Sequence, residues 1–220
     1  YLVYDAVRRV DIVNTIEKNE TRAKEACYFA FPFAAQQPAF EYQIQNAWCR
    51  PNEDQMPGAC REWFTPQNLV HLGDGAFDVA WATPDAPLVC LTDINRGKWL
   101  AHLPINNGHI YSYVMHNYWF TNYRSQQGGT LRFRYSITSG RNMTRGQLAR
   151  FDADTRTPVM AYPFVSSFSA KVGGESRPLP AADGSFLALD APDLQIVTLK
   201  AAEDEAGYIL RFREIAGRAG

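Results

Sequence analysis

Short apolar runs separated by turn residues recur along most of the sequence, and they constrain the fold more than any other feature. The clearest run is 131–138, LRFRYSIT, in which apolar residues occupy every second position. Because side chains alternate between the two faces of a strand, this segment predicts a strand with one buried and one polar side. We expect further strands over 1–16, 27–33, 40–44, 69–72, 77–81, 88–91, 111–115, 185–189, 194–201 and 208–215.

One helix is expected among these strands, over 142–152, with Thr144 as its N-cap. Strands at short spacing with a single helix indicate an all-β fold, a large antiparallel β-sandwich with one short helix. A chain of 220 residues can bury a sizeable core, so we expect one domain over 1–220. The chain opens at Tyr1 already in a strand pattern, which suggests a piece of a longer protein.

The charge pattern argues against nucleic-acid and membrane partners. The formal net charge is -1, and acidic and basic residues are scattered along the chain instead of forming a basic stripe. No apolar run approaches the roughly 18 residues that cross a membrane. We therefore expect a soluble protein that binds neither nucleic acid nor a membrane.

The densest aromatic segment is 110–124, IYSYVMHNYWFTNYR. Regular alternation would place Tyr111, Tyr113 and Met115 together on one face of a strand, in the core of the sandwich. The strand then breaks into N-Y-W-F-T-N, which combines flat aromatic rings with amides. Such groups stack on a sugar ring and hydrogen-bond to its hydroxyls, but they also suit a central aromatic strand. Both interpretations stay open on these residues alone.

No self-sufficient catalytic motif is present. The sequence lacks G-x-S-x-G, a glycine-rich phosphate loop and H-E-x-x-H. Hydrolysis of a glycosidic bond needs two facing carboxylates, and the candidate acids lie in loops whose relative placement is open: Glu53, Asp54, Glu62, Asp85 and Asp93. The histidines have no recognised metal-ligand spacing: His71, His102, His109 and His116. We therefore assign no catalytic residue and no metal ligand.

The cysteines and tryptophans leave two questions open. Cys27 and Cys90 lie in apolar runs and are expected to be buried thiols. Cys49 and Cys60 bracket a proline-containing loop, and both a disulfide bridge and two free thiols stay open for them. Large aromatics usually fill cores. Trp63 and Trp119 fit that role least among the tryptophans, because polar, loop-like residues flank both.

Five segments, taken in order, resemble the C-terminal β-sandwich region of glycoside hydrolase family 38, the α-mannosidases. They are KEACYFAFPF at 24–33, MPGACREWFTPQNLVHL at 56–72, VAWATPDAPLV at 79–89, YVMHNYWFTNYRSQQGG at 113–129 and VTLKAAEDEAGYILRFREIAG at 197–217. The resemblance covers most of the chain and points to a bacterial branch of the family. It implies a supersandwich of the galactose-mutarotase-like type, in the bacterial cytoplasm or periplasm.

The resemblance also implies a division of labour. The parent would be a retaining α-mannosidase whose N-terminal domain carries the zinc ion and the aspartate nucleophile. Neither has a matching position here, so we expect the fragment to be inactive alone and to hold no cofactor. Its expected partners are that missing catalytic domain of the same chain and a mannose-containing glycan.

In the family, the β-region contributes to the rim of the sugar-binding cleft. The corresponding candidates here are Asn117, Trp119 and Asn122 from N-Y-W-F-T-N, with Arg61 and Trp63 from P-G-A-C-R-E-W-F. His116 departs from the amide expected at its position, which argues against a sugar contact there. Two alternatives stay open: a stand-alone carbohydrate-binding module, and a purely structural scaffold domain.

Overall fold

A computed structural model of the 220-residue chain describes residues 1–95, 97–118, 124, 126–157, 159–161, 184–185 and 187–217. Its contacts group into two compact units, Tyr1–Arg156 and Thr157–Gly220, where one domain was expected. Each unit is therefore described by itself.

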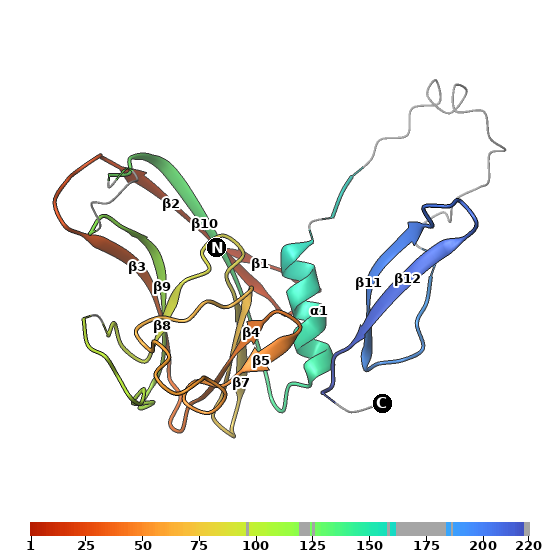
Figure 1. Ribbon diagram of the computed structural model, residues 1–220, viewed down its shortest axis with the longest axis horizontal. Helices are drawn as coiled ribbons and strands as arrows, with labels where there is room; N and C mark the ends of the chain where they lie inside the picture. Colours follow the sequence, from red (N-terminus) through yellow and green to blue (C-terminus); the bar gives the residue numbers. More distant parts are fainter. Residues whose placement is uncertain are drawn as a thin grey trace. The chain divides into compact units, whose positions relative to one another are not determined.

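The first unit contains two antiparallel sheets (Figure 1). The larger sheet has the strand order β1-β2-β10-β7-β6-β4-β5. Its strands are β1 (Leu2–Val3), β2 (Val10–Lys18), β4 (Ala39–Ile44), β5 (Ala47–Cys49), β6 (Leu69–Gly73), β7 (Asp78–Ala82) and β10 (Gly129–Gly140). The smaller sheet has the order β3-β9-β8, with β3 (Ala26–Phe33), β8 (Val89–Leu91) and β9 (Gly108–His116). The predicted all-β antiparallel sandwich is confirmed.

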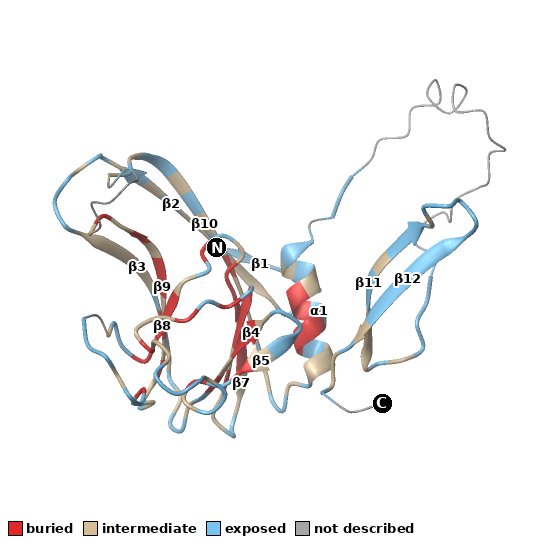
Figure 2. Cartoon of the chain, in the orientation of Figure 1, coloured by how far each residue is buried: buried red, intermediate tan, exposed pale blue. Residues whose placement is uncertain are grey.

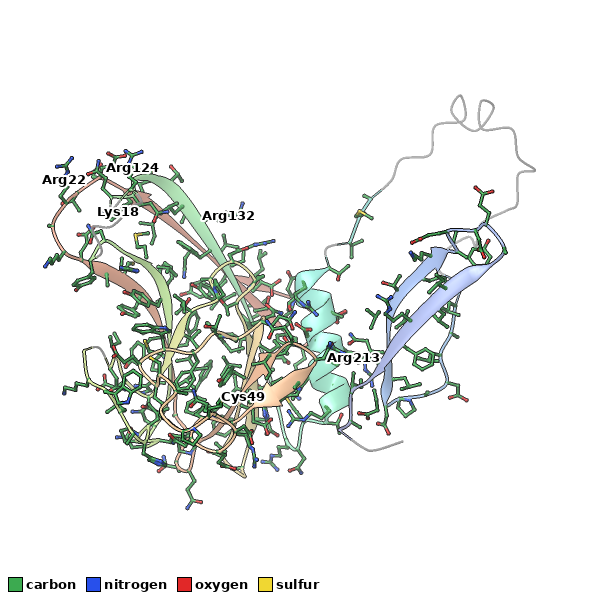
Figure 3. All side chains as sticks on the ribbon, viewed as in Figure 1. Lys18, Arg22, Cys49, Arg124, Arg132 and Arg213 are labelled. Carbon is green, nitrogen blue, oxygen red and sulfur yellow. The ribbon has the colours of Figure 1, made fainter. Side chains whose placement is uncertain are left out.

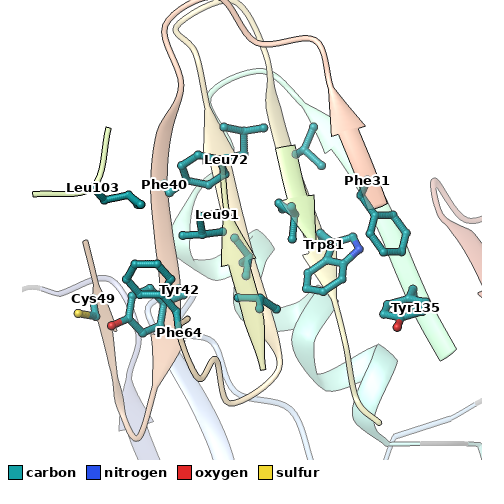
Figure 4. Packing of buried hydrophobic residues seen from close by; sticks show 14 residues of the cluster. Phe31, Phe40, Tyr42, Cys49, Phe64, Leu72, Trp81, Leu91, Leu103 and Tyr135 are labelled. Carbon is teal, nitrogen blue, oxygen red and sulfur yellow. The ribbon is translucent and has the colours of Figure 1, made fainter. Parts of the chain in front are cut away.

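The main core lies between these two sheets. Trp81 of β7 and Tyr135 of β10 stack with their ring centroids 5.5 Å apart, and Phe31 of β3 packs edge-on against Trp81 (Figure 4). Tyr135 donates a hydrogen bond across the sandwich, 2.9 Å from its hydroxyl to Ser112 Oγ of β9. Burial raises the pKa of Tyr135 to about 12. The inward face predicted for β10 is confirmed, because Phe133, Tyr135 and Ile137 all belong to this core.

A helix, α1 (Arg145–Arg156), packs against the outer face of the larger sheet. It begins at the predicted cap: Thr144 Oγ1 accepts from the Gln147 amide at 3.3 Å, and Gln147 Oε1 accepts from the Thr144 amide at 2.8 Å. Leu148 and Phe151 are buried against Leu69 of β6 and Ala80 and Ala82 of β7. The middle of the helix is coloured as buried in Figure 2. Within the described part of the chain, no helix is long and apolar enough to cross a membrane.

The second unit contains a hairpin of β11 (Leu194–Ala201) and β12 (Tyr208–Glu214), which confirms the two strands predicted at this end. Its register gathers apolar residues on one face, where Ile196 pairs with Phe212 and Leu199 pairs with Leu210. The expected strand over 185–189 is wrong for the residues described there, 185 and 187–189, none of which is in a strand.

Candidate functional site

The outer face of the smaller sheet carries the candidate site, and the register of β9 explains which residues reach it. Ile110 belongs to the core and Ser112 bonds to Tyr135, so both face inward. Tyr113, the next residue, therefore faces outward. It stacks on Tyr28 of β3, with ring centroids 4.5 Å apart and planes at 13°.

A β-bulge at Val114 changes the alternation in the last part of β9. Tyr113 pairs with Tyr28, but Met115 pairs with Cys27, so that Val114 has no opposite residue. Tyr113 and Met115 are both buried, as expected, yet they lie on opposite faces. The prediction that Tyr111, Tyr113 and Met115 share one face is therefore wrong, because regular alternation ends at the bulge.

The bulge also directs the ring of His116 to the outer face, where it follows Tyr113. The two rings lie 5.4 Å apart between centroids, and the ring of Tyr118 follows at 6.2 Å from His116, both tilted by less than 40°. Together with Tyr28 these side chains form a row of four rings along the sheet, which we call the ring row. A row of flat rings offers an apolar floor for a flat ligand.

The same outer face continues past β9 onto β8 and the chain segment before β6. Phe64 makes an isolated antiparallel bridge with Val89 of β8, with Phe64 N to Val89 O at 2.8 Å and Val89 N to Phe64 O at 2.9 Å. Phe64 and Val89 are both in the core. Alternation then places their neighbours, Trp63 and Leu88, on the outer face.

A cavity of about 540 Å³ lies on this outer face. Its volume is within the usual range of small-ligand pockets. It is lined by Glu62, Trp63, Leu88, Gly97, Tyr113, His116 and Tyr118. We call it the outer pocket.

Glu62 holds the loop around Gly97 in place beside the outer pocket. Its Oε2 accepts a hydrogen bond from the Gly97 amide at 2.9 Å. Gly97 has a φ of 70°, in the left-handed region that glycine adopts at little cost. The carboxylate of Glu62 thus has a fixed position among the lining residues.

Trp63 is the one sequence-predicted site residue that lines this pocket in the described part of the chain. Arg61 is 6% exposed and directs its guanidinium to Asn52 Oδ1 at 3.1 Å and to the Ala59 carbonyl at 3.0 Å. It holds the loop before Trp63. Trp119 and Asn122 lie outside the described residues.

Asn117 links the chain that follows β9 to the β2–β3 connection through hydrogen bonds. It is 7% exposed, its Oδ1 accepts from the Glu25 amide at 2.6 Å, and its Nδ2 donates to the Thr21 carbonyl at 3.1 Å. Both functional groups of its side chain are therefore engaged with the β2–β3 connection. Asn117 positions its neighbours His116 and Tyr118 by fixing the backbone that follows β9.

The β2–β3 connection also contacts the β9–β10 connection at residues 124 and 126. Arg124 pairs with Glu20, Gln126 Nε2 donates to Glu20 Oε2 at 3.3 Å, and Arg22 Nε donates to Gln126 Oε1 at 3.1 Å. Arg22 and Arg124 lie at the same end of the sandwich (Figure 3). The chain is thus fastened on both sides of 119–123, at Asn117 and at Arg124.

The pocket residues that sequence reasoning missed are Tyr113, His116, Tyr118 and Leu88. Glu62 was considered only as a possible catalytic acid. The position of Leu88 follows from its place beside Val89 once the bridge to Phe64 is known. The position of His116 depends on the bulge, for which the sequence carries no local signal, whereas Tyr113 faces outward by alternation from Ser112.

Other loop acids are held in ion pairs. Arg50 binds Asp54 through two nitrogens, at 3.0 and 2.9 Å, and also pairs with Glu53 at 2.6 Å. The hydrogen bonds from the Arg50 side chain, followed by the one from the Arg50 backbone amide, lower the pKa of Asp54 to about 2. Arg134 binds Asp85 in the same way, and its hydrogen bond is the largest cause of the lowered pKa of Asp85.

A titratable cluster lies on the outer face of the larger sheet. His71 Nε2 is 3.1 Å from Asp78 Oδ1, and its Nδ1 is 3.5 Å from Glu41 Oε2. Arg145, at the start of α1, binds Glu41 at 2.6 Å. The hydrogen bond with His71, followed by the contacts with Arg145, lowers the pKa of Glu41 to about 2. The cluster ties the first turn of the helix to the sheet.

The thiols and histidines complete the inventory of reactive side chains. All four cysteines are free, so Cys49 and Cys60 are not bridged. Among the described residues, no three acidic, cysteine or histidine side chains are grouped as a metal site would require.

Comparison with known proteins gives no further identification. No model of a known protein family matches this chain. No curated protein matches it significantly either.

Proposed function

We propose that this chain is a non-catalytic, sugar-contacting β-sandwich module of a family 38-like α-mannosidase. The observation that carries the proposal is the outer pocket, in which Trp63 lines the same cavity as three members of the ring row. Its volume of about 540 Å³ accommodates a pyranose ring with space for part of a neighbouring one. Aromatic faces pack against the C–H faces of a sugar, while its hydroxyls reach polar groups at the rim.

Bond cleavage is assigned to the missing catalytic domain, with its zinc ion and aspartate nucleophile. The five sequence segments that resemble the family's C-terminal region support this assignment of the parent. Within the described lining of the outer pocket, Glu62 is the single carboxylate, whereas the usual glycosidase mechanisms use a pair. The pocket would thus bind and orient a mannose-containing glycan, in the bacterial cytoplasm or periplasm, while the chemistry occurs elsewhere.

Packing on that catalytic domain is the second part of the proposal. The hairpin of the second unit supports it, because Leu199, Tyr208 and Phe212 are 53%, 82% and 52% exposed. Isolated two-stranded hairpins are marginally stable in water, so a covering surface would stabilise this one. Hydrogen exchange tests this: the backbone amides of 194–214 should exchange fast in this chain and become protected in the parent protein. Equal exchange in both would contradict the packing role.

Titration with methyl α-mannoside tests the sugar contact. We expect tryptophan fluorescence to respond at millimolar sugar, and Trp63→Ala to weaken binding at least about tenfold, which is about 1.4 kcal/mol. Trp99→Ala is the matched control, because Trp99 is 68% exposed and does not line the pocket. No response from the folded chain, or an undiminished response from Trp63→Ala, would overturn the proposal.

An activity assay tests the non-catalytic assignment. The 220-residue chain should not hydrolyse an aryl α-mannoside, with or without added zinc. Zinc-dependent hydrolysis by the purified chain would contradict it.

A further inference from the structure

Glu62, unlike several acids of the nearby loops, forms no ion pair with a cation in the part of the chain that the structure describes. Glu53 and Asp54 pair with Arg50, and Asp85 pairs with Arg134. The carboxylate lines the outer pocket, and its one hydrogen bond is to the neutral Gly97 amide. Its negative charge therefore acts on whatever occupies the pocket.

The remaining lining adds to the attraction for a positive charge. The faces of tryptophan and tyrosine rings carry negative electrostatic potential, so a cation held among them is stabilised. Trp63, Tyr113 and Tyr118 line the same cavity as the Glu62 carboxylate. Rings beside a carboxylate are the chemical surroundings in which proteins bind organic cations.

We propose that the outer pocket prefers a sugar that carries a protonated amine, an amino sugar such as mannosamine, over the neutral sugar, and that Glu62 sets this preference. This inference rests on the proposed function, because it concerns the same pocket. The ring row would contact the sugar ring, and the carboxylate would pair with the ammonium group. A sugar that bears a carboxylate, such as mannuronate, would be repelled by the same charge.

Four ligands of one sugar series, titrated into the 220-residue chain, separate the contributions. Saturation-transfer NMR would follow mannose, mannosamine, N-acetylmannosamine and mannuronate at low salt. We expect mannosamine to bind about tenfold more tightly than mannose. N-acetylmannosamine, whose nitrogen is neutral, should lose this gain, and mannuronate should bind more weakly than mannose. Added salt should reduce the advantage of mannosamine, since it screens exposed charge pairs.

Glu62→Gln is the decisive variant because it keeps the hydrogen-bond acceptor for Gly97 and removes the charge. We expect mannose and mannosamine to bind to it within about twofold of each other. Glu53→Gln is the matched control: Glu53 lies in a nearby loop, does not line the pocket, and should leave the preference intact. Ethanolamine, an amine without a sugar ring, should bind more weakly than mannosamine.

Each outcome has one meaning. If mannose and mannosamine bind the wild-type chain equally, or if Glu62→Gln keeps the tenfold preference, the amine inference is wrong and the sugar site remains. If ethanolamine matches mannosamine, the pocket recognises the amine without the sugar ring, which also overturns the inference. If no sugar of the series binds the folded chain, the proposed function itself fails.

Discussion

The outer faces of the two sheets differ, because a helix covers part of one and a pocket lies on the other. The larger sheet has its outer face closed by α1, whose Leu148 and Phe151 are buried against it. The smaller sheet leaves its outer face open as the outer pocket, with aromatic rings along the floor. The comparison suggests that stability is concentrated at the closed face and ligand binding at the open one.

The two outer faces also differ in how the carboxylate at each of them is hydrogen-bonded. Under the helix, Asp152 is fully buried and accepts hydrogen bonds from Gln43 at 3.0 Å and Asn68 at 2.7 Å, with Arg156 at 2.5 Å. In the outer pocket, Glu62 accepts from one backbone amide and pairs with no described cation. A satisfied buried carboxylate stabilises a structure, whereas a carboxylate without a cation is suited to a ligand.

Removal of the buried Asp152 carboxylate should have the largest effect on the free energy of unfolding. Asp152→Ala should destabilise the chain by about 3–5 kcal/mol, because Gln43 Nε2 loses its acceptor, Asn68 Nδ2 loses one of two, and Arg156 loses its ion pair. Urea unfolding followed by circular dichroism measures this. A loss below about 1 kcal/mol would mean that the closed face contributes little.

Apolar packing of the helix should have a somewhat smaller effect. Leu148→Ala creates a cavity against Leu69, Ala80 and Ala82, for an expected loss of about 2–3 kcal/mol in the same unfolding experiment. Arg150→Ala, at an exposed position on the same helix, is the control and should change stability by no more than about 0.5 kcal/mol. Equal effects of the two would contradict the packing.

Acid should weaken the closed face through Glu41. Its pKa is about 2 in the folded chain against an ordinary 4.5, so the carboxylate stabilises the fold above pH 4.5. That stabilisation is lost as the pH falls from 4.5 toward 2. We expect Glu41→Gln to cost about 1–2 kcal/mol at neutral pH, after allowance for solvent screening, and the difference from wild type to vanish in acid. A difference that is constant with pH would refute this linkage.

The smallest stability effect is expected at the open face. Tyr118→Ala should change the free energy of unfolding by about 1 kcal/mol or less while weakening binding of methyl α-mannoside about tenfold. Thermal unfolding and fluorescence titration of the same samples measure both quantities. A large stability loss with unchanged sugar affinity would place Tyr118 among the structural residues and remove the contrast between the faces.

Local patterns in the sequence were sufficient for much of the fold. Alternation predicted the inward face of β10, and the spacing of Thr144 and Gln147 accounts for the start of α1. Both signals depend on neighbours within a few residues, which the sequence displays directly. The strand β5 was missed because Ala47–Cys49 is short and lies inside what was expected to be an irregular loop.

The site was harder to predict because pairing between distant segments creates it. Trp63 faces the outer pocket because Phe64 pairs with Val89, and His116 faces it because β9 bulges against β3. Register between strands depends on the whole sheet, and a shift of one residue exchanges the two faces. Asn117 and Arg61 were predicted as sugar contacts from the family resemblance, but their side chains are engaged within the fold.

The bulge at Val114 also determines where β9 tolerates insertions and deletions. Upstream of it, Ser112 faces the core and Tyr113 the pocket, and downstream Met115 and His116 repeat that order one residue out of phase. Deleting Val114 would therefore restore a regular ladder with every other residue on its present face. Deleting Ser112 instead would move the side chains on one side of the deletion to the opposite face of the sheet. A length change in this strand is neutral for the pocket at one position and disruptive at its neighbours.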